Sequence, residues 1–360
     1  MNIGIVGLPN VGKTTIFNAL AHAHAPNENY PFCTIEPNRS SVAVPDSRLN
    51  RLAELVHPHK VIPAHVEFVD VAGLVEGASR GEGLGNQFLG HVRASEVIAQ
   101  VVRCFSNDDV ACQLPGIDPK KEIGIVATEL LIADLQVAER ALGKSPRDDK
   151  KTSLFSRVHD ALSQGSALRG VNFSADEKDL LKEFGFLSLK PIIVIANVGE
   201  RDTDLERGWG EEVSREAKGM GAESIAICAA MEEELADLTD EEAAEFLKEM
   251  NMTERVLPRF IRKCYELLGV ITFFTLESGI VQAWAVRQGT AAPQAAGHIH
   301  TDMEKGFVKA EVVAFKDLER LGDLSGARAK GLLRIEGRDY LVRDGDVIRF
   351  RFAPAPCSEK

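Results

Sequence analysis

The chain has 360 residues, of which 44% are hydrophobic and 27% charged, and its formal net charge is −12. This length is enough for two or three domains, and the acidic balance argues against a protein that coats itself in nucleic acid or binds DNA. No apolar run is long enough to span a bilayer, and Met1 and Asn2 lead into an apolar run rather than a signal peptide, so we expect a cytoplasmic protein with no membrane contact.

The first predicted element is a strand over residues 3–6, which leads into Gly7-Leu8-Pro9-Asn10-Val11-Gly12-Lys13-Thr14, a complete G-x-x-x-x-G-K-[ST] phosphate-binding loop. A predicted helix over residues 16–20 follows the loop. The two glycines let the backbone turn its N–H groups toward phosphate oxygens, the lysine supplies a charge to the terminal phosphates, and the threonine hydroxyl suits Mg²⁺. We therefore expect nucleotide contacts from Asn10, Val11, Gly12, Lys13, Thr14 and Thr15.

Two later segments predict the remaining parts of a nucleotide switch. Residues 22–41 lack periodicity, which is typical of a long loop, and this loop contains Thr34. The predicted strand over residues 66–71 ends in a D-x-x-G motif, from Asp70 to Gly73. In nucleotide switches such an aspartate reaches Mg²⁺ through water, and such a glycine N–H contacts the γ-phosphate. We expect Thr14, Thr34 and Asp70 to hold Mg²⁺, and Lys13 and Gly73 to be the catalytic groups.

Two continuous apolar runs, at residues 97–102 and 191–196, predict buried strands of a mostly parallel sheet. The chain between them is far longer than one crossover connection needs. Apolar residues recur at helical spacing from Ile123 to Val137 and from Leu154 to Leu162, on either side of a break at 145–149. This pattern predicts an antiparallel helical hairpin, coiled-coil-like, inserted into the α/β domain. Ser174 and Glu177 form a capping box that predicts a third, short helix.

The predicted base-reading loop is Asn197-Val198-Gly199-Glu200, directly after the strand that follows the insertion. We expect Asn197, Val198 and Glu200 to contact the nucleotide. An aspartate at the last position would accept both donors of guanine, but Glu200 is one methylene longer, which weakens selectivity for guanine. The Asn197 amide can pair with the donor and acceptor of adenine. Residue chemistry alone leaves both ATP and GTP open.

The last 83 residues differ in charge and pattern from the rest of the chain. They carry a net charge of +2, whereas the preceding residues carry −14. Apolar alternation over 308–313, 340–342 and 347–352, with glycines at turns, predicts a small β-rich domain that docks a partner. We expect a G-type domain over 1–124 and 190–277, the hairpin over 125–189, and this domain over 278–360. Its basic residues predict an RNA-facing surface: Arg328, Lys330, Arg334, Arg338, Arg349 and Arg351.

Together these motifs resemble the Obg-related P-loop NTPases, and specifically the Obg-like ATPases of the YchF type. The resemblance covers nearly the whole chain: residues 7–15, 30–34, 70–75, 197–200 and 283–302, the last of which looks like a TGS domain. It implies a Mg²⁺-dependent ATPase whose partner is the ribosome, through either or both subunits. Val198 and Glu200 depart from the common N-K-x-D pattern, and Leu74 stands where a catalytic glutamine usually sits. Both departures agree with this family, and Leu74 predicts slow hydrolysis because it cannot orient water.

Two other interpretations stay open. A metabolic P-loop kinase would need an acceptor pocket and an arginine-rich lid, whereas the extra chain here predicts a hairpin and a β-rich tail, which favours the switch. A non-catalytic nucleotide-sensing scaffold is compatible with Leu74 in place of glutamine.

Overall fold

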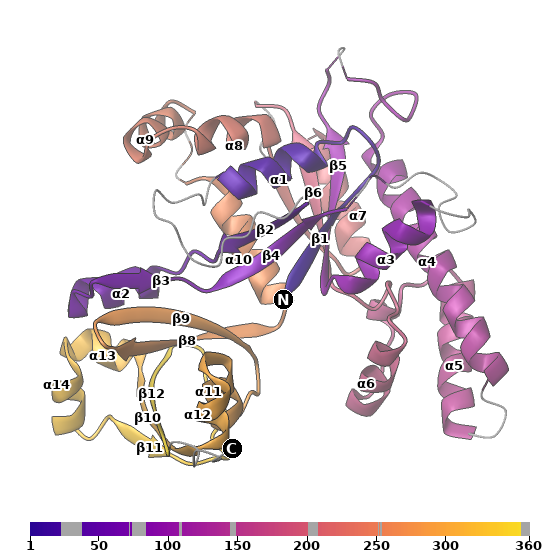
Figure 1. Cartoon of the computed structure of the whole chain (residues 1–360). Coiled ribbons are helices and arrows are strands. Elements are labelled where there is room, and N and C mark those ends of the chain that lie inside the picture. Colours follow the sequence, from indigo (N-terminus) through magenta and orange to yellow (C-terminus); the bar gives the residue numbers. More distant parts are fainter. Residues whose placement is uncertain are drawn as a thin grey trace, which may run out of the picture. The chain divides into compact units, whose positions relative to one another are not determined.

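The computed structural model describes residues 1–22, 38–71, 73, 84–107, 110–144, 149–200, 208–250, 252 and 254–353. The chain divides into two compact units (Figure 1). The first comprises Met1–Val42 and Glu67–Phe260, and the second comprises Ala43–Val66 and Ile261–Lys360. Among the described residues, helices that are both long and apolar enough to cross a membrane do not occur.

The first unit contains a six-stranded sheet in the order β2-β4-β1-β5-β6-β7. β1 pairs in parallel with β4 and β5, and β5, β6 and β7 continue the parallel pairing, which confirms the predicted α/β class. Every residue of β5 and β6 is buried, so their continuous apolar runs belong to strands covered on both faces. The strands are β1 (Asn2–Val6), β2 (Arg39–Ala43), β4 (His65–Asp70), β5 (Val97–Cys104), β6 (Ile192–Val198) and β7 (Glu223–Ile227).

Parallel pairing brings the carboxyl ends of β1, β4, β5, β6 and β7 to one edge of this sheet, where ligands bind in open α/β folds. The phosphate loop follows β1, Asp70 ends β4, and Asn197 lies near the end of β6. The helices that connect strands of this sheet include α1 (Lys13–His22), α3 (Leu84–Ala94) and α7 (Gly208–Gly219). After β7 come α8 (Ala229–Ala236), α9 (Asp240–Glu249), which begins with the capping box of Thr239 and Glu242, and α10 (Val256–Leu267), which belongs to the first unit up to Phe260.

The insertion between β5 and β6 consists of α4 (Pro119–Lys144), α5 (Asp149–Ser163), a short 3₁₀ helix η1 (Leu168–Gly170) and α6 (Ala175–Glu183). Figure 1 shows α4 and α5 as neighbours, and α6 begins at the predicted capping box of Ser174 and Glu177. The hairpin has its own core around Phe155, whereas the first half of α4, from Ile123 to Ala133, packs in the core of the sheet. One helix thus serves both cores, so the expected boundary at residue 125 falls inside a continuous helix.

The second unit contains a mixed sheet in the order β11-β10-β12-β8-β9-β3. β8–β9, β10–β12 and β10–β11 pair antiparallel, while β12–β8 and β3–β9 pair in parallel. The helices α11 and α12 pack in its core with Phe273 and Phe350. Its elements are β3 (Lys60–Ile62), β8 (Val270–Glu277), β9 (Ile280–Arg287), α11 (Ala292–Ile299), α12 (Thr301–Lys305), β10 (Phe307–Ala314), α13 (Phe315–Leu321), α14 (Leu324–Ala329), β11 (Arg334–Glu336) and β12 (Asp346–Phe352).

The second unit is larger than the predicted C-terminal domain over 278–360. β8 pairs with β9 from Val270↔Arg287 to Glu277↔Ile280, so a boundary at 278 would cut through the turn of a hairpin. Residues 43–66 also belong to this unit, because β3 extends its sheet and α2 (Ser47–Val56) is fastened to it. Arg48 of α2 donates to Asp344 at 2.6 Å and lies over the ring of Phe274 at 5.4 Å.

Candidate nucleotide-binding site

The phosphate loop has the backbone that its glycines predict. Gly12 has φ 96°, and a Cβ at this position would collide with the side-chain amide of Asn197. A Cβ on Gly7 would lie 2.5 Å from the carbonyl oxygen of Val101 in β5. Asn10 also adopts a left-handed conformation, with φ 65°. Glycine is thus required at positions 7 and 12 by close approach as well as by backbone angle.

Lys13, Thr14 and Asp70 meet at the carboxyl edge of the sheet. The Lys13 side chain is 8% exposed, and its Nζ donates to the carbonyl of Leu8 at 2.8 Å. Thr14 Oγ1 donates to Asp70 Oδ2 at 3.1 Å. Burial lowers the pKa of Lys13, and the charges of Asp70 and Glu122 oppose this shift. Burial likewise raises the pKa of Asp70, against the hydrogen bond from Thr14 and the charge of Lys13.

Gly73 lies beside this group. A Cβ at Gly73 would be 3.3 Å from Lys13 Nζ and 3.3 Å from the backbone nitrogen of Pro9, so the D-x-x-G glycine borders the phosphate loop. The backbone of Gly73 is therefore close to the place where the terminal phosphate of a bound nucleotide would meet Lys13. Two residues of the sequence prediction, Thr34 and Leu74, lie outside the described residues.

The Thr14 hydroxyl and the Asp70 carboxylate suit Mg²⁺, a hard cation that takes oxygen ligands. In the part of the chain that the structure describes, no three His, Cys, Asp or Glu side chains gather in a way that could hold a metal. Mg²⁺ usually binds one or two protein groups and fills its other positions with water and phosphate oxygens.

Asn197 makes two contacts within the protein that the sequence did not predict. Its side chain is 4% exposed, with Nδ2 donating to the carbonyl of Val11 at 2.9 Å and Oδ1 accepting from the Ala229 N–H at 3.1 Å. The amide thus connects the phosphate loop to the start of α8. Asn197 therefore joins these loops through one hydrogen of Nδ2 and one lone pair of Oδ1, and the second position of each atom stays available to a base.

The other two predicted base contacts differ from each other in exposure. Val198 is 3% exposed, and its side chain packs in the core of the first unit. Glu200 is exposed in the turn after β6. Of the predicted trio, Glu200 therefore presents its side chain outside the core, and Val198 has a packing role.

Sequence analysis missed two buried charged residues behind the phosphate loop, Arg103 and Glu122. Arg103 lies in β5 and is 4% exposed, while Glu122 lies in the first turn of α4 and is 3% exposed. Glu122 Oε2 accepts from the backbone N–H of Arg103 at 2.9 Å. Burial raises the pKa of Glu122 to about 7, even though Arg103 and Lys13 act to lower it. A charged residue in an otherwise apolar run was the signal that could have identified Arg103.

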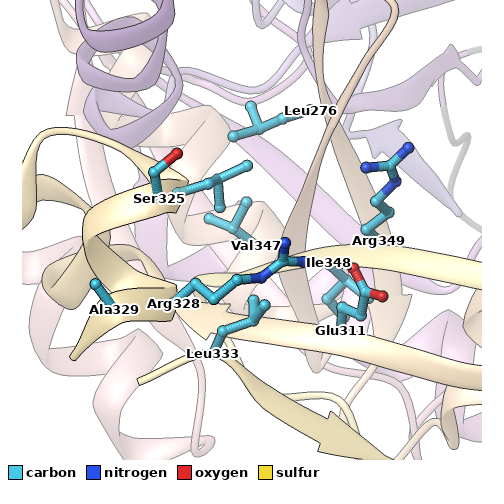
Figure 2. A pocket seen from close by; sticks show the side chains of 10 residues that line it. Leu276, Glu311, Ser325, Arg328, Ala329, Leu333, Val347, Ile348 and Arg349 are labelled. Carbon is cyan, nitrogen blue, oxygen red and sulfur yellow. Dashed lines mark ion pairs between the residues drawn. The ribbon is translucent and has the colours of Figure 1, made fainter. Parts of the chain in front are cut away.

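The second unit has a pocket of about 390 Å³ beside α14 (Figure 2). Glu311 is held by Arg351, whose Nε lies 3.0 Å from Oε1. Arg328 and Arg349 are more loosely paired, at 4.0 Å from Glu311 and 3.8 Å from Glu277. An apolar floor therefore lies beside two exposed guanidinium groups. The pocket is lined by Leu276, Glu311, Leu324, Ser325, Arg328, Ala329, Leu333, Val347, Ile348 and Arg349.

Two other predicted basic residues of this unit, Arg334 and Arg338, have partners within the unit. Arg334 forms an ion pair with Glu336 at 2.9 Å and lies over the ring of Tyr340. Arg338 donates to the carbonyl of Phe307 at 3.1 Å. Part of the predicted RNA-facing surface is therefore used inside the unit.

Comparison with known proteins matches one family model to the N-terminal part of the chain and a second to its C-terminal part. A family model described as a 50S ribosome-binding GTPase matches residues 2–133, and the YchF-GTPase_C model, described as a protein of unknown function (DUF933), matches 270–353. The chain is 47% identical to the ribosome-binding ATPase YchF of Haemophilus ducreyi, over 97% of this chain and 98% of that protein. It is 43% identical to the protein of the same name from Bacillus subtilis, over 98% and 99%.

A solved structure agrees with these matches. The Schizosaccharomyces pombe YchF GTPase superimposes with a TM-score of 0.89 at 35% identity, over 98% of this chain and 97% of that one. The similarity extends across the phosphate loop, the insertion and the C-terminal sheet. The chain belongs to the YchF family and is a P-loop NTPase.

Proposed function

We propose that this chain is a slow, Mg²⁺-dependent ATPase of the cytoplasm that binds the ribosome and reports its nucleotide state to it. The observation that carries the proposal is the 3.1 Å hydrogen bond between Thr14 and Asp70 beside the buried Lys13. It brings two oxygen ligands and a fixed cation to one end of the phosphate loop. Relatives named ribosome-binding ATPase support the choice of nucleotide and partner.

Each residue of this site has one task in the proposal. The N–H groups of the loop from Asn10 to Thr15 bind phosphate oxygens, and Lys13 neutralises charge on the terminal phosphates. Thr14, Asp70 and Thr34 would hold Mg²⁺, which would supply positive charge to neutralise the charge that develops on the phosphates. The backbone N–H of Gly73 would contact the γ-phosphate.

Hydrolysis should be slow because position 74 is a leucine, which has no group to orient or polarise water. A phosphate oxygen, a backbone group or a group from a partner must then activate the water. Ribosomes are the partner we expect to speed this step.

The choice of ATP rests on the relatives and on what the base loop lacks. Val198 is packed in the core and cannot cover the base as a lysine stem would, and the longer Glu200 weakens the bidentate match to guanine. We expect ATP to bind at least a few-fold more tightly than GTP, a difference of about 1 kcal/mol or more. GTP stays a second substrate in this proposal.

Ribosome binding is assigned to the second unit. Its pocket places Arg328 and Arg349 beside an apolar floor, and exposed guanidinium groups suit RNA phosphates. The rest of the chain has a net negative charge and would be repelled by RNA. Binding should therefore weaken as salt rises.

Phosphate release from ATP and from GTP, each with and without Mg²⁺ and ribosomes, tests the proposal. Lys13→Ala should abolish tight nucleotide binding, whereas the exposed Lys178→Ala on α6 should leave it unchanged. Tight binding with no phosphate release, even with ribosomes, would support the scaffold hypothesis. A clear preference for GTP would overturn the base assignment, and release only in the presence of a small acceptor would point to a kinase.

A further inference from the structure

We propose that Arg103 is a positioning residue of the nucleotide site, which holds the phosphate loop in its binding conformation through the backbone carbonyl of Ala111, which anchors Asn10. This inference rests on the proposed nucleotide site and adds to it a residue that touches neither phosphate nor metal.

Arg103 uses its guanidinium to organise the chain that follows β5. Nε donates to the carbonyl of Phe105 at 3.2 Å, and Nη2 donates to that of Asn107 at 3.1 Å. Nη1 donates to Val110 at 3.0 Å and lies 3.4 Å from the carbonyl of Ala111. The guanidinium also lies over the Phe105 ring, 4.6 Å from its centroid. One planar side chain therefore fixes four carbonyl oxygens, a geometry that a lysine ammonium cannot reproduce.

The last of these carbonyls also binds the phosphate loop. Asn10 Nδ2 donates to the Ala111 carbonyl at 3.2 Å, across 101 positions of sequence. Asn10 is one of the few residues other than glycine with positive φ among those described, at 65°. A left-handed asparagine costs backbone energy unless its surroundings hold it. The hydrogen bond to the Ala111 carbonyl stabilises this conformation of Asn10, and Arg103 holds that carbonyl in place.

Glu122 holds the backbone of Arg103 in place. Its carboxylate accepts the backbone N–H of Arg103 at 2.9 Å, and its own backbone carbonyl is within 3.5 Å of Gln100 Nε2. These contacts join the first turn of α4 to the end of β5. β5 also lies close to the phosphate loop at Gly7, where a Cβ would collide with the backbone carbonyl oxygen of Val101. Glu122 thus holds the backbone of Arg103, and the Arg103 side chain in turn holds the carbonyl of Ala111.

The expected consequence is a change in substrate binding rather than in the chemical step. A loop that is held in place before binding does not have to be ordered by the nucleotide, so releasing it weakens affinity. The loop binds the phosphates in both the ground state and the transition state. Loss of such uniform binding raises KM and leaves kcat unchanged.

The test measures KM and kcat for ATP in wild type, Arg103→Ala, Asn10→Ala and the double variant. Asn10→Ala should raise KM about fivefold, which corresponds to the net free-energy contribution of one hydrogen bond, and should leave kcat within about twofold of wild type. Arg103→Ala should raise KM at least as much, and the double variant should be no worse than Arg103→Ala. Arg103→Lys keeps a buried cation with fewer donors, so its KM should lie above that of wild type, and this variant provides the test if the alanine variant does not fold.

Arg169→Ala is the matched control. Arg169 lies in η1 of the same unit and also donates to three carbonyls, those of Ser188, Lys190 and Met220. Its loss should reduce thermal stability and leave KM unchanged. A fold defect lowers the active fraction and therefore kcat, so the two effects are separable.

The outcomes distinguish this inference from the proposed function. An unchanged KM in Arg103→Ala and Arg103→Lys would overturn the inference, and so would an equal rise in Arg169→Ala. Additive effects of Arg103→Ala and Asn10→Ala would show that Arg103 does not act through Asn10 and would also overturn it. A wild-type protein that neither binds nor hydrolyses ATP would instead contradict the proposed function.

Discussion

Glu122→Gln should change how stability depends on pH, because Glu122 holds a carboxyl group in the core of the first unit. Burial raises its pKa from 4.5 to about 7 in the folded protein. Between these values the folded state binds the proton more tightly than the unfolded state does. The free energy of unfolding therefore falls as pH rises from 4.5 to about 7, and this contribution is constant above that range.

The size of this effect follows from the two pKa values. One pKa unit corresponds to about 1.36 kcal/mol, so the difference between 4.5 and about 7 amounts to about 3 kcal/mol. The glutamine variant keeps an oxygen that can accept from the Arg103 N–H at the same place, and it does not ionise. Relative to wild type, Glu122→Gln should therefore gain about 3 kcal/mol between pH of about 4.5 and about 8.

Denaturant unfolding at about pH 5, 6, 7 and 8 measures this difference. The chain has two tryptophans, Trp209 in α7 of the first unit and Trp284 in β9 of the second. A Trp284→Phe background makes Trp209 fluorescence a reporter of the unit that contains Glu122. The exposed Glu245→Gln on α9 is the control and should follow wild type at every pH. Parallel curves for Glu122→Gln and wild type would refute the reasoning.

Three further predictions concern the metal, the hairpin and the partner surface. Thr14→Ala should weaken nucleotide affinity about tenfold in Mg²⁺ and leave it unchanged in EDTA, as measured by calorimetry; an equal loss in both buffers would remove Thr14 from the metal shell. Phe155→Ala should cost about 3 to 5 kcal/mol in the hairpin core, where this ring is fully buried and lies 4.7 Å from that of Phe184, and hydrogen exchange in α5 should report it while ATP binding persists. Arg349→Ala should make the plot of log ribosome affinity against log salt shallower by about one phosphate contact, and an unchanged slope would place the contact elsewhere.

The parts of the site that the sequence predicts are those whose chemistry is local. The phosphate loop needs glycine where the backbone turns and approaches its neighbours, and Gly12 has both a positive φ and no room for a Cβ. The capping boxes at Ser174 and Thr239 are likewise local, and the one at Ser174 forms as predicted. Asp70 could be paired with Thr14 because parallel strands bring their carboxyl ends together.

Long-range pairing accounts for what sequence analysis missed in the fold. Residues 43–66 contain a helix and a three-residue strand whose pattern is unremarkable, and they join the second unit through distant partners: β3 pairs with β9, and Arg48 meets Asp344, 296 positions later. No local signal specifies such a partner. The same holds for β8, whose assignment depends on pairing with β9 and β12 rather than on its own apolar run.

The base-reading loop shows how one residue can carry two interpretations that only packing separates. An asparagine after a buried strand predicts an adenine contact, since its amide matches the donor and acceptor of that base. The same amide also matches a peptide carbonyl and a peptide N–H, and Val11 and Ala229 present both to Asn197 at 2.9 and 3.1 Å. Leaving these backbone groups unpaired in a site where Asn197 is 4% exposed would cost free energy, so the protein groups retain one hydrogen and one lone pair of the amide. We propose that selectivity for ATP comes from groups other than the Asn197 side chain, and we expect Asn197→Ala to weaken ATP and GTP binding by the same factor. A selective loss of ATP binding in parallel titrations would show that the amide does meet the base.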